Sequence, residues 1–171
     1  IKTLTASGSA SLAFVDGAAS VVLDDTYDEY MFVFSNLGPA TENVNFQFQV
    51  NATDDAGGGY DTSPIQSTFF KAHNQEDDGG TDLAYHTSHD QQNGTGHQTL
   101  AYDVGSDADQ SVAGILHLIN PSSTTFLKHF YSRTNNAYSS DISMDTFVAG
   151  YINDTTAIDE IQFKMSSGNF D

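Results

Sequence analysis

The stretch YDEYMFVFSNLGPATENVNFQFQV (residues 27–50) contains two apolar-rich runs that are separated by a turn-forming segment. In the second run apolar and polar side chains alternate, which is typical of a β-strand that buries one face. The first run, residues 29–36, is apolar on both sides, so we expect a central strand with the second run as its half-exposed neighbour. The polar row of that neighbour is the predicted subunit interface and consists of Asn45, Gln47 and Gln49.

Period-two runs recur along the whole chain of 171 residues, and no helical pattern competes with them. The connections between them are rich in Gly, Asp, Asn, Ser and Thr, which form turns. Because so many strands exceed one flat sheet, we expect an all-β fold, an antiparallel two-sheet sandwich of jelly-roll-like type. The length fits a single domain over residues 1–171. The candidate strands cover residues 1–6, 9–15, 29–36, 44–51, 66–73, 82–87, 97–103, 111–119, 125–133, 145–152 and 158–165.

The charge of the chain excludes several classes of partner. Acidic residues outnumber basic ones by 23 to 5, and the formal net charge is −18. A surface of this sign repels phosphate backbones, so we expect no nucleic-acid partner. No apolar stretch approaches the roughly 20 residues that cross a bilayer, so no membrane insertion is expected. The chain has no cysteine, which excludes a disulfide scaffold, and its start at Ile1 suggests a processed product or the ordered part of a longer polypeptide.

Three groups of aspartates in the polar connections make calcium a candidate ligand, because calcium binds carboxylate and carbonyl oxygens. None of the groups follows the spaced calcium loop that ends in Glu, so we predict no metal site and no cofactor. The motif HTSH at residues 86–89 places its two imidazoles on opposite faces of a strand, which does not favour a metal either. The aspartate groups are Asp54, Asp55 and Asp61; Asp77, Asp78 and Asp82; and Asp103, Asp107 and Asp109.

Aromatic side chains in the loops are the candidate ligand-binding residues. Tyrosine rings stack on sugars, and neighbouring carboxylates and amides bind sugar hydroxyls. The packing of each ring over its own loop is the alternative. The candidates are Tyr60, Asp61, Tyr85 and Tyr138.

Catalytic motifs are missing from the sequence. There is no Gly-x-Ser-x-Gly motif, which would present a nucleophilic serine. The acids lie in turns rather than among the apolar neighbours that raise the pKa of a catalytic carboxyl group. We therefore predict that the chain is not an enzyme.

Four stretches, in this order along the chain, resemble structural modules of tailed bacteriophages, particularly marine ones. They are core strands and turns, and they carry no chemical signature. Together they cover most of the chain from Thr26 to Asp171. The stretches are TYDEYMFVFSNLGPATENVNFQFQV, GGGYDTSP, DQSVAGILHLINPSSTTFLKHFYSR and FVAGYINDTTAIDEIQFKMSSGNFD.

The resemblance implies a non-enzymatic virion protein, a jelly-roll-like sandwich in a fibre, tail or head-decoration appendage. Its expected partners are other virion proteins and a glycan or protein of the host surface. A homo-oligomer is expected, with a trimer favoured because fibres commonly have threefold symmetry. In similar sequences SSGN is followed by a short apolar strand, which this chain either lacks or continues into beyond Asp171. The alternatives are a carbohydrate-binding module or lectin-like domain, with or without calcium, and a glycan-cleaving tail-spike enzyme.

Overall fold

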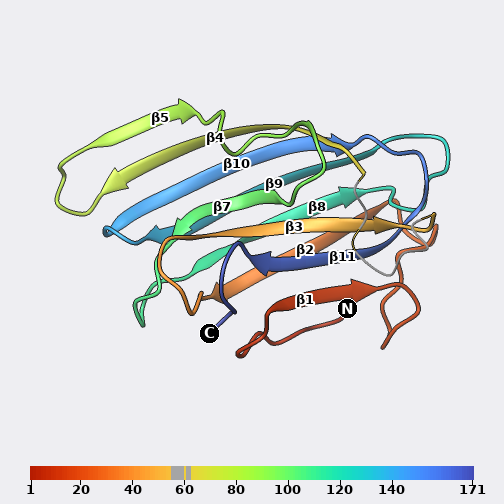
Figure 1. Cartoon of the computed structure of the whole chain (residues 1–171), viewed down its shortest axis with the longest axis horizontal. Coiled ribbons are helices and arrows are strands. Elements are labelled where there is room, and N and C mark those ends of the chain that lie inside the picture. The colour runs from red at the N-terminus through yellow and green to blue at the C-terminus, as the bar shows by residue number, and fades with distance from the viewer. Residues whose placement is uncertain (55–59, 61–62) are drawn as a thin grey trace.

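The computed structural model describes every residue except 55–59 and 61–62 (Figure 1). The described residues form eleven strands and no helix, which confirms the all-β prediction. Alternating apolar residues explain the strands, since each strand can place them on one side of the sheet. The strands are β1 (Ser11–Val15), β2 (Glu29–Leu37), β3 (Val44–Ala52), β4 (Ile65–Gln75), β5 (Thr81–Tyr85), β6 (Gln92–Gly94), β7 (Gln98–Val104), β8 (Val112–Ile119), β9 (Lys128–Tyr138), β10 (Ile142–Ile152) and β11 (Ile158–Met165).

All strand pairs are antiparallel, as predicted, and they form one hydrogen-bonded sheet that falls into two groups. The first group has the order β1-β11-β3-β7. The second group has the order β2-β8-β9-β10-β4, and both β5 and β6 pair with β4. The two groups are joined by a single residue pair between β7 and β9, Val104 and Tyr138.

Side chains of the two groups pack against each other and form one hydrophobic core. In Figure 1 strands β3 and β11 overlie β2 and β8. Phe34 of β2 lies 4.9 Å from Phe46 of β3 and 5.0 Å from Phe163 of β11, between ring centroids. Phe48 of β3 lies 5.0 Å from Phe130 of β9. Edge-to-face contacts of this kind stabilise a core beyond the burial of apolar area.

The two strands within residues 27–50 occupy the opposite positions in the fold from those that the sequence predicts, one central and one at an edge. β3 is paired on both sides, with β11 and β7, so the strand expected to be half-exposed is central. β2 pairs only with β8 among the described residues, so the strand expected to be central lies at an edge. Met31 and Val33 of β2 are 58% and 65% exposed. The prediction failed because apolar residues on both faces of a strand indicate burial only if both faces are covered.

Other boundaries also differ from the predicted ones. Residues 1–6 are not a strand, and the short strand β6 was not expected. β9 continues to Tyr138, five residues beyond the predicted strand end at residue 133, and so includes TNNAY of the expected connection TNNAYSSD. This segment alternates in burial because Thr134 and Asn136 donate hydrogen bonds inward, to the carbonyls of Leu100 and Tyr102. A polar residue can occupy an inward position when a carbonyl group accepts its hydrogen bond.

Candidate functional site

An apolar row crosses the outward side of the second strand group. On β9 the exposed residues alternate with buried ones, and the strand registers continue the exposed positions from β2 to β5. Six residues that are paired one after another therefore lie in one line across the sheet. We call this line the outer row, and it consists of Val33, Ile115, Arg133, Phe147, Phe70 and Tyr85.

The aromatic rings on this side stack on each other. The rings of Phe70 and Phe147 are parallel within 5°, with centroids 4.8 Å apart. In the neighbouring row the rings of His117 and Tyr131 stack, with their centroids 4.4 Å apart and their planes within 9° of parallel. The Arg133 guanidinium carbon lies 4.8 Å from the Phe147 centroid, which is a cation–π contact. The rings thus cover one another, and the surface between them is a shallow apolar hollow of about 300 Å³.

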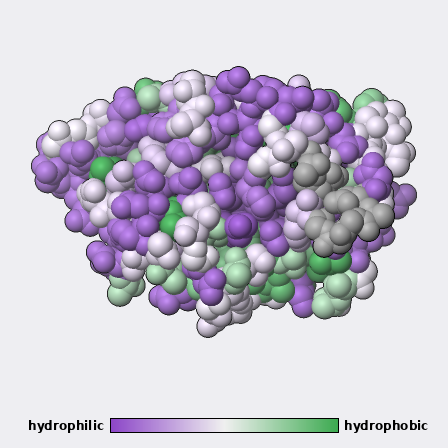
Figure 2. Space-filling view, in the orientation of Figure 1, coloured by the Kyte–Doolittle hydropathy of each residue, from purple (hydrophilic) through white to green (hydrophobic). Residues whose placement is uncertain are grey.

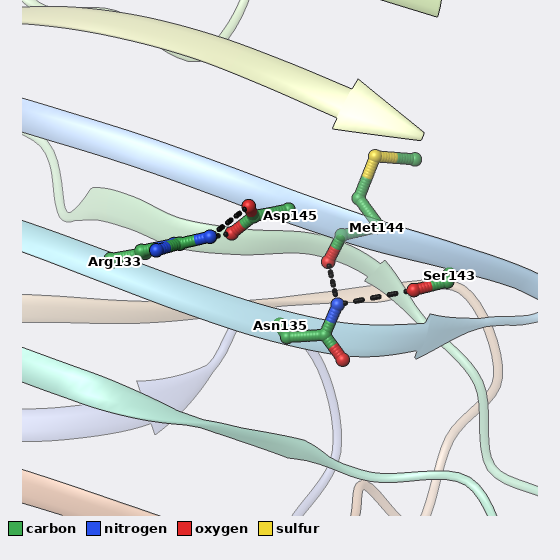
Figure 3. A network of polar contacts seen from close by, with 5 residues as sticks. All are labelled: Arg133, Asn135, Ser143, Met144 and Asp145. Atoms are coloured by element: carbon green, nitrogen blue, oxygen red, sulfur yellow. Dashed lines mark hydrogen bonds and ion pairs between the residues drawn. The ribbon is translucent and has the colours of Figure 1, made fainter. Parts of the chain in front are cut away.

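Two acidic side chains face outward on strands β2, β8, β9, β10 and β4, and each is paired. Arg133 donates to both carboxylate oxygens of Asp145, at 3.0 and 2.8 Å (Figure 3). This pair raises the pKa of the Arg133 guanidinium through a side-chain hydrogen bond and the charge of Asp145. Glu29 lies 2.5 Å from His117 Nδ1 and accepts a hydrogen bond from Tyr131. On a chain of net charge −18 this side is therefore unusually poor in free carboxylates.

A second hollow, of about 360 Å³, lies beside β4, β7, β9 and β10, and we call it the tyrosine cleft. Tyr102 is 5% exposed, and its ring lies 4.8 Å from His89 and 5.0 Å from His86. The two imidazole rings stack with centroids 4.7 Å apart, and the rings of Tyr138 and Tyr102 meet edge to face with centroids 6.2 Å apart. The polar lining also includes Lys71, His73, Gln75 and Asp103.

Burial controls the charge states in the tyrosine cleft. It raises the pKa of the Tyr102 hydroxyl and lowers the pKa of the His89 imidazole, and the charge of His86 lowers it further. Lys71 Nζ lies 2.9 Å from His73 Nδ1 and 3.5 Å from Asp82. Burial thus favours the uncharged form of His89, and Lys71, whose ammonium group is paired with Asp82, lines the same cleft.

The four predicted ligand-binding residues do not form one site. Tyr138 lines the tyrosine cleft, whereas Tyr85 lies at the end of the outer row and donates to Asp90 at 2.6 Å. Tyr60 is half-buried near Glu160, and the pKa of its hydroxyl is raised by burial and by that carboxylate. Asp61 lies outside the described residues.

The predicted interface row of β3 is largely used within the chain. Gln49 is 2% exposed, and its amide donates to the carbonyls of Thr95 and Gly96 at 3.2 and 3.3 Å. Gln47 donates to Thr99, and Asn45 accepts a hydrogen bond from the Asp103 amide. Gln49 therefore does not face solvent, because buried polar groups find partners in the segment next to them, whereas Asn45 and Gln47 are half-buried.

The sequence analysis did not predict the outer row, although two sequence patterns were consistent with it. EYMFVFSN is apolar on both sides, and it could have indicated an edge strand with an uncovered face. HFYSRTNNA alternates in a way that leaves Tyr131 and Arg133 outward. The alignment across six strands depends on registers that no local pattern contains.

Two features are absent from the described part of the chain. No group of three or more His, Asp or Glu side chains there could hold a metal ion. That part also includes no helix of the length and apolarity needed to span a membrane.

Comparisons with protein-family models, with curated proteins and with solved structures gave no match.

Proposed function

We propose that the chain is a non-enzymatic structural module of a phage virion, in a fibre, tail or head-decoration appendage, and that its outer row packs against another virion protein. The observation that carries the proposal is the pairing of both outward acids on an apolar sheet face. Exposed apolar patches with a polar rim mark interaction sites, and charged residues are depleted at the centre of interfaces. A contact made through this face avoids the repulsion that two acidic surfaces would produce.

The strand order supports the jelly-roll part of the proposal. In an eight-stranded jelly roll two Greek keys interleave, so that the first, eighth, third and sixth strands share one sheet. The second, seventh, fourth and fifth strands share the other. When β6 and the hairpin β9–β10 are left out, the strands of this chain follow these orders, β1-β11-β3-β7 and β2-β8 with β4-β5. The hairpin is inserted between β8 and β4.

The lining of the tyrosine cleft supports a non-enzymatic role. Glycoside hydrolysis uses two carboxyl groups that flank the scissile bond. The described lining contains one carboxylate, Asp103, together with an ammonium group that is already paired with Asp82. This arrangement lacks the acid pair that a glycan-cleaving tail spike needs.

Immunogold labelling of phage particles that encode this chain tests the proposal. With an antibody against the purified chain, we expect label at a fixed position on intact particles. Mass spectrometry should find peptides of the chain among the structural proteins. If the chain occurs only in the lysate and never on purified particles, the proposal is overturned.

A carbohydrate-binding module is the second candidate function, and the tyrosine cleft favours it. Its rings and polar groups are the combination that binds sugars. Screening of the purified chain on a glycan array tests this candidate. A hit that Tyr138→Ala abolishes and Tyr85→Ala leaves unchanged would favour it over a purely structural role.

A further inference from the structure

Strand β2 has one unpaired side. Residues Glu29–Phe34 and Leu37 of β2 pair with β8, with a register shift between Phe34 and Leu37, and the described residues place no strand along the other side. The backbone groups on such an edge form a template for another strand. Proteins protect long edges with Lys, Pro, inward charges, β-bulges or short strand length. The register shift of β2 lies after Phe34, so the segment Glu29–Phe34 before it contains none of these devices.

The core is also incomplete next to this edge. Phe32 of β2 and Phe14 of β1 are only partly buried, although their rings touch at a centroid distance of 5.3 Å. β1 is likewise unpaired on one side, since it pairs with β11 alone among the described residues. In Figure 2 hydrophobic surface gathers along the lower rim of the view, where Figure 1 draws β1. A strand added beside β2 would cover Phe32.

Length selects the strand that fits this edge. The described chain has three other edge strands, β1 and β5 with five residues each and β6 with three. None of them matches the six regularly paired residues Glu29–Phe34 in full. A second copy of β2 does, and identical strands that run antiparallel are complementary to each other by symmetry.

The distribution of charge on the chain also favours a second copy of β2 at this edge. Between Tyr30 and Leu37 strand β2 carries no charged residue, and neither does β1. Two copies of a chain with net charge −18 associate best where their contact contains no carboxylate. The edge of β2 meets this condition.

We infer that β2 pairs antiparallel with β2 of a second copy, across a twofold axis at Phe32. This register places Met31 of one copy beside Val33 of the other on the outward side, and Glu29 beside Ser35. The two Glu29 residues are then six positions apart along the strands, about 20 Å. This separation exceeds the Debye length of about 8 Å at physiological salt, so their repulsion is screened.

The pairing makes a dimer, because a twofold contact closes with two copies. It replaces the trimer that fibre symmetry favours. It joins the second strand groups of both copies into one sheet, so that their outer rows lie on the same side. The inference deepens the proposed structural role but is tested separately, since a dimer can be measured whether or not virions carry the chain.

Sedimentation velocity and hydrogen exchange of the purified chain measure this contact. We expect a monomer–dimer equilibrium with a dissociation constant on the order of micromolar, because the contact is small. At high concentration the amides of residues 29–37 should exchange more slowly, while those of the opposite edge strand β5 should not change. A chain that stays monomeric up to millimolar concentration overturns the inference.

Charge substitutions test the register. Val33→Glu puts a carboxylate beside Met31 of the other copy and should weaken the dimer about tenfold. Adding Met31→Lys should recover most of that loss, because each carboxylate then faces an ammonium group across the twofold axis. Both side chains are more than half exposed, so the fold should survive, and thermal unfolding checks this. Leu83→Glu, at an equally exposed position on β5, is the matched control and should leave the dimer unchanged.

The remaining outcomes overturn the inference in different ways. Loss of the dimer without recovery in the double variant means that β2 pairs in another register or not at all. A trimer that all three substitutions leave intact places the contact elsewhere. Protection of residues 29–37 in a monomer, at every concentration, would mean that a segment of the same chain occupies the edge.

Discussion

The side-chain amide of Gln98 donates a 3.0 Å hydrogen bond to the backbone carbonyl of His89. Gln98 is fully buried, and its carbonyl oxygen accepts a 2.6 Å hydrogen bond from Ser67. The Ser67 hydroxyl in turn accepts from the Gln91 amide. This buried chain of hydrogen bonds holds the segment between β5 and β7 against β4, and so it positions one wall of the tyrosine cleft.

Gln98→Leu should loosen that wall. The substitution removes the acceptor of the buried Ser67 hydroxyl and the side-chain donor to the His89 carbonyl, which costs about 1 to 3 kcal/mol. We expect lower stability in urea unfolding and faster hydrogen exchange over residues 86–91. Gln92→Leu, at an exposed position on β6, is the control and should change neither measurement. Equal effects of both substitutions would contradict the role of this network.

Phe46→Ala and Phe163→Ala should each destabilise the fold by about 3 to 5 kcal/mol, because each leaves a cavity in the core. The two rings are buried and stack at a centroid distance of 6.0 Å. Urea unfolding followed by circular dichroism measures the change. Phe126→Ala removes a ring that is 69% exposed, so its effect should stay within about 0.5 kcal/mol.

Lys128→Met should destabilise the connection that follows β10. The Lys128 side chain is fully buried, and its ammonium group donates to the carbonyls of Asp154 and Thr156. Burial lowers the pKa of this group, whereas the charge of Asp154 opposes that shift. Methionine keeps the volume but leaves buried carbonyls unpaired, at a cost of about 1 to 3 kcal/mol. Lys2→Met, in the exposed N-terminal segment, should leave the unfolding midpoint in place.

Stability should fall as the pH decreases below about 6.5, the ordinary pKa of histidine. Burial lowers the pKa of His89 and of His97 in the folded chain, so the unfolded chain binds more protons in this window. The loss is complete once the pH lies below the folded pKa values. Carboxyl groups with lowered pKa values, such as those of Asp154 and Glu42, act only near pH 4 and below. Urea midpoints between pH 7.5 and 5 measure the slope.

Replacing His89 and His97 by Gln should flatten that slope. A slope that persists in the double variant would assign the pH dependence to other titratable groups. His129→Gln is the matched control, because His129 is an exposed histidine on β9.

The sequence by itself determined the class of the fold and most of the strand positions. The alternation in VNFQFQV and IDEIQFKM predicts β3 and β11, and the structure buries the apolar inward set of each strand, together with Gln49 of β3. This success has a local cause, because the period of two follows from the geometry of a single strand.

Only the tertiary structure decided which strands are central and which surfaces are free. EYMFVFSN and VNFQFQV exchange their expected positions, since the neighbours of a strand come from distant parts of the chain. The outer row and the tyrosine cleft depend on the same long-range registers, and so does the open edge of β2. Pairing between distant segments follows from the sum of their contacts, whereas a local pattern records only which face of a strand is apolar.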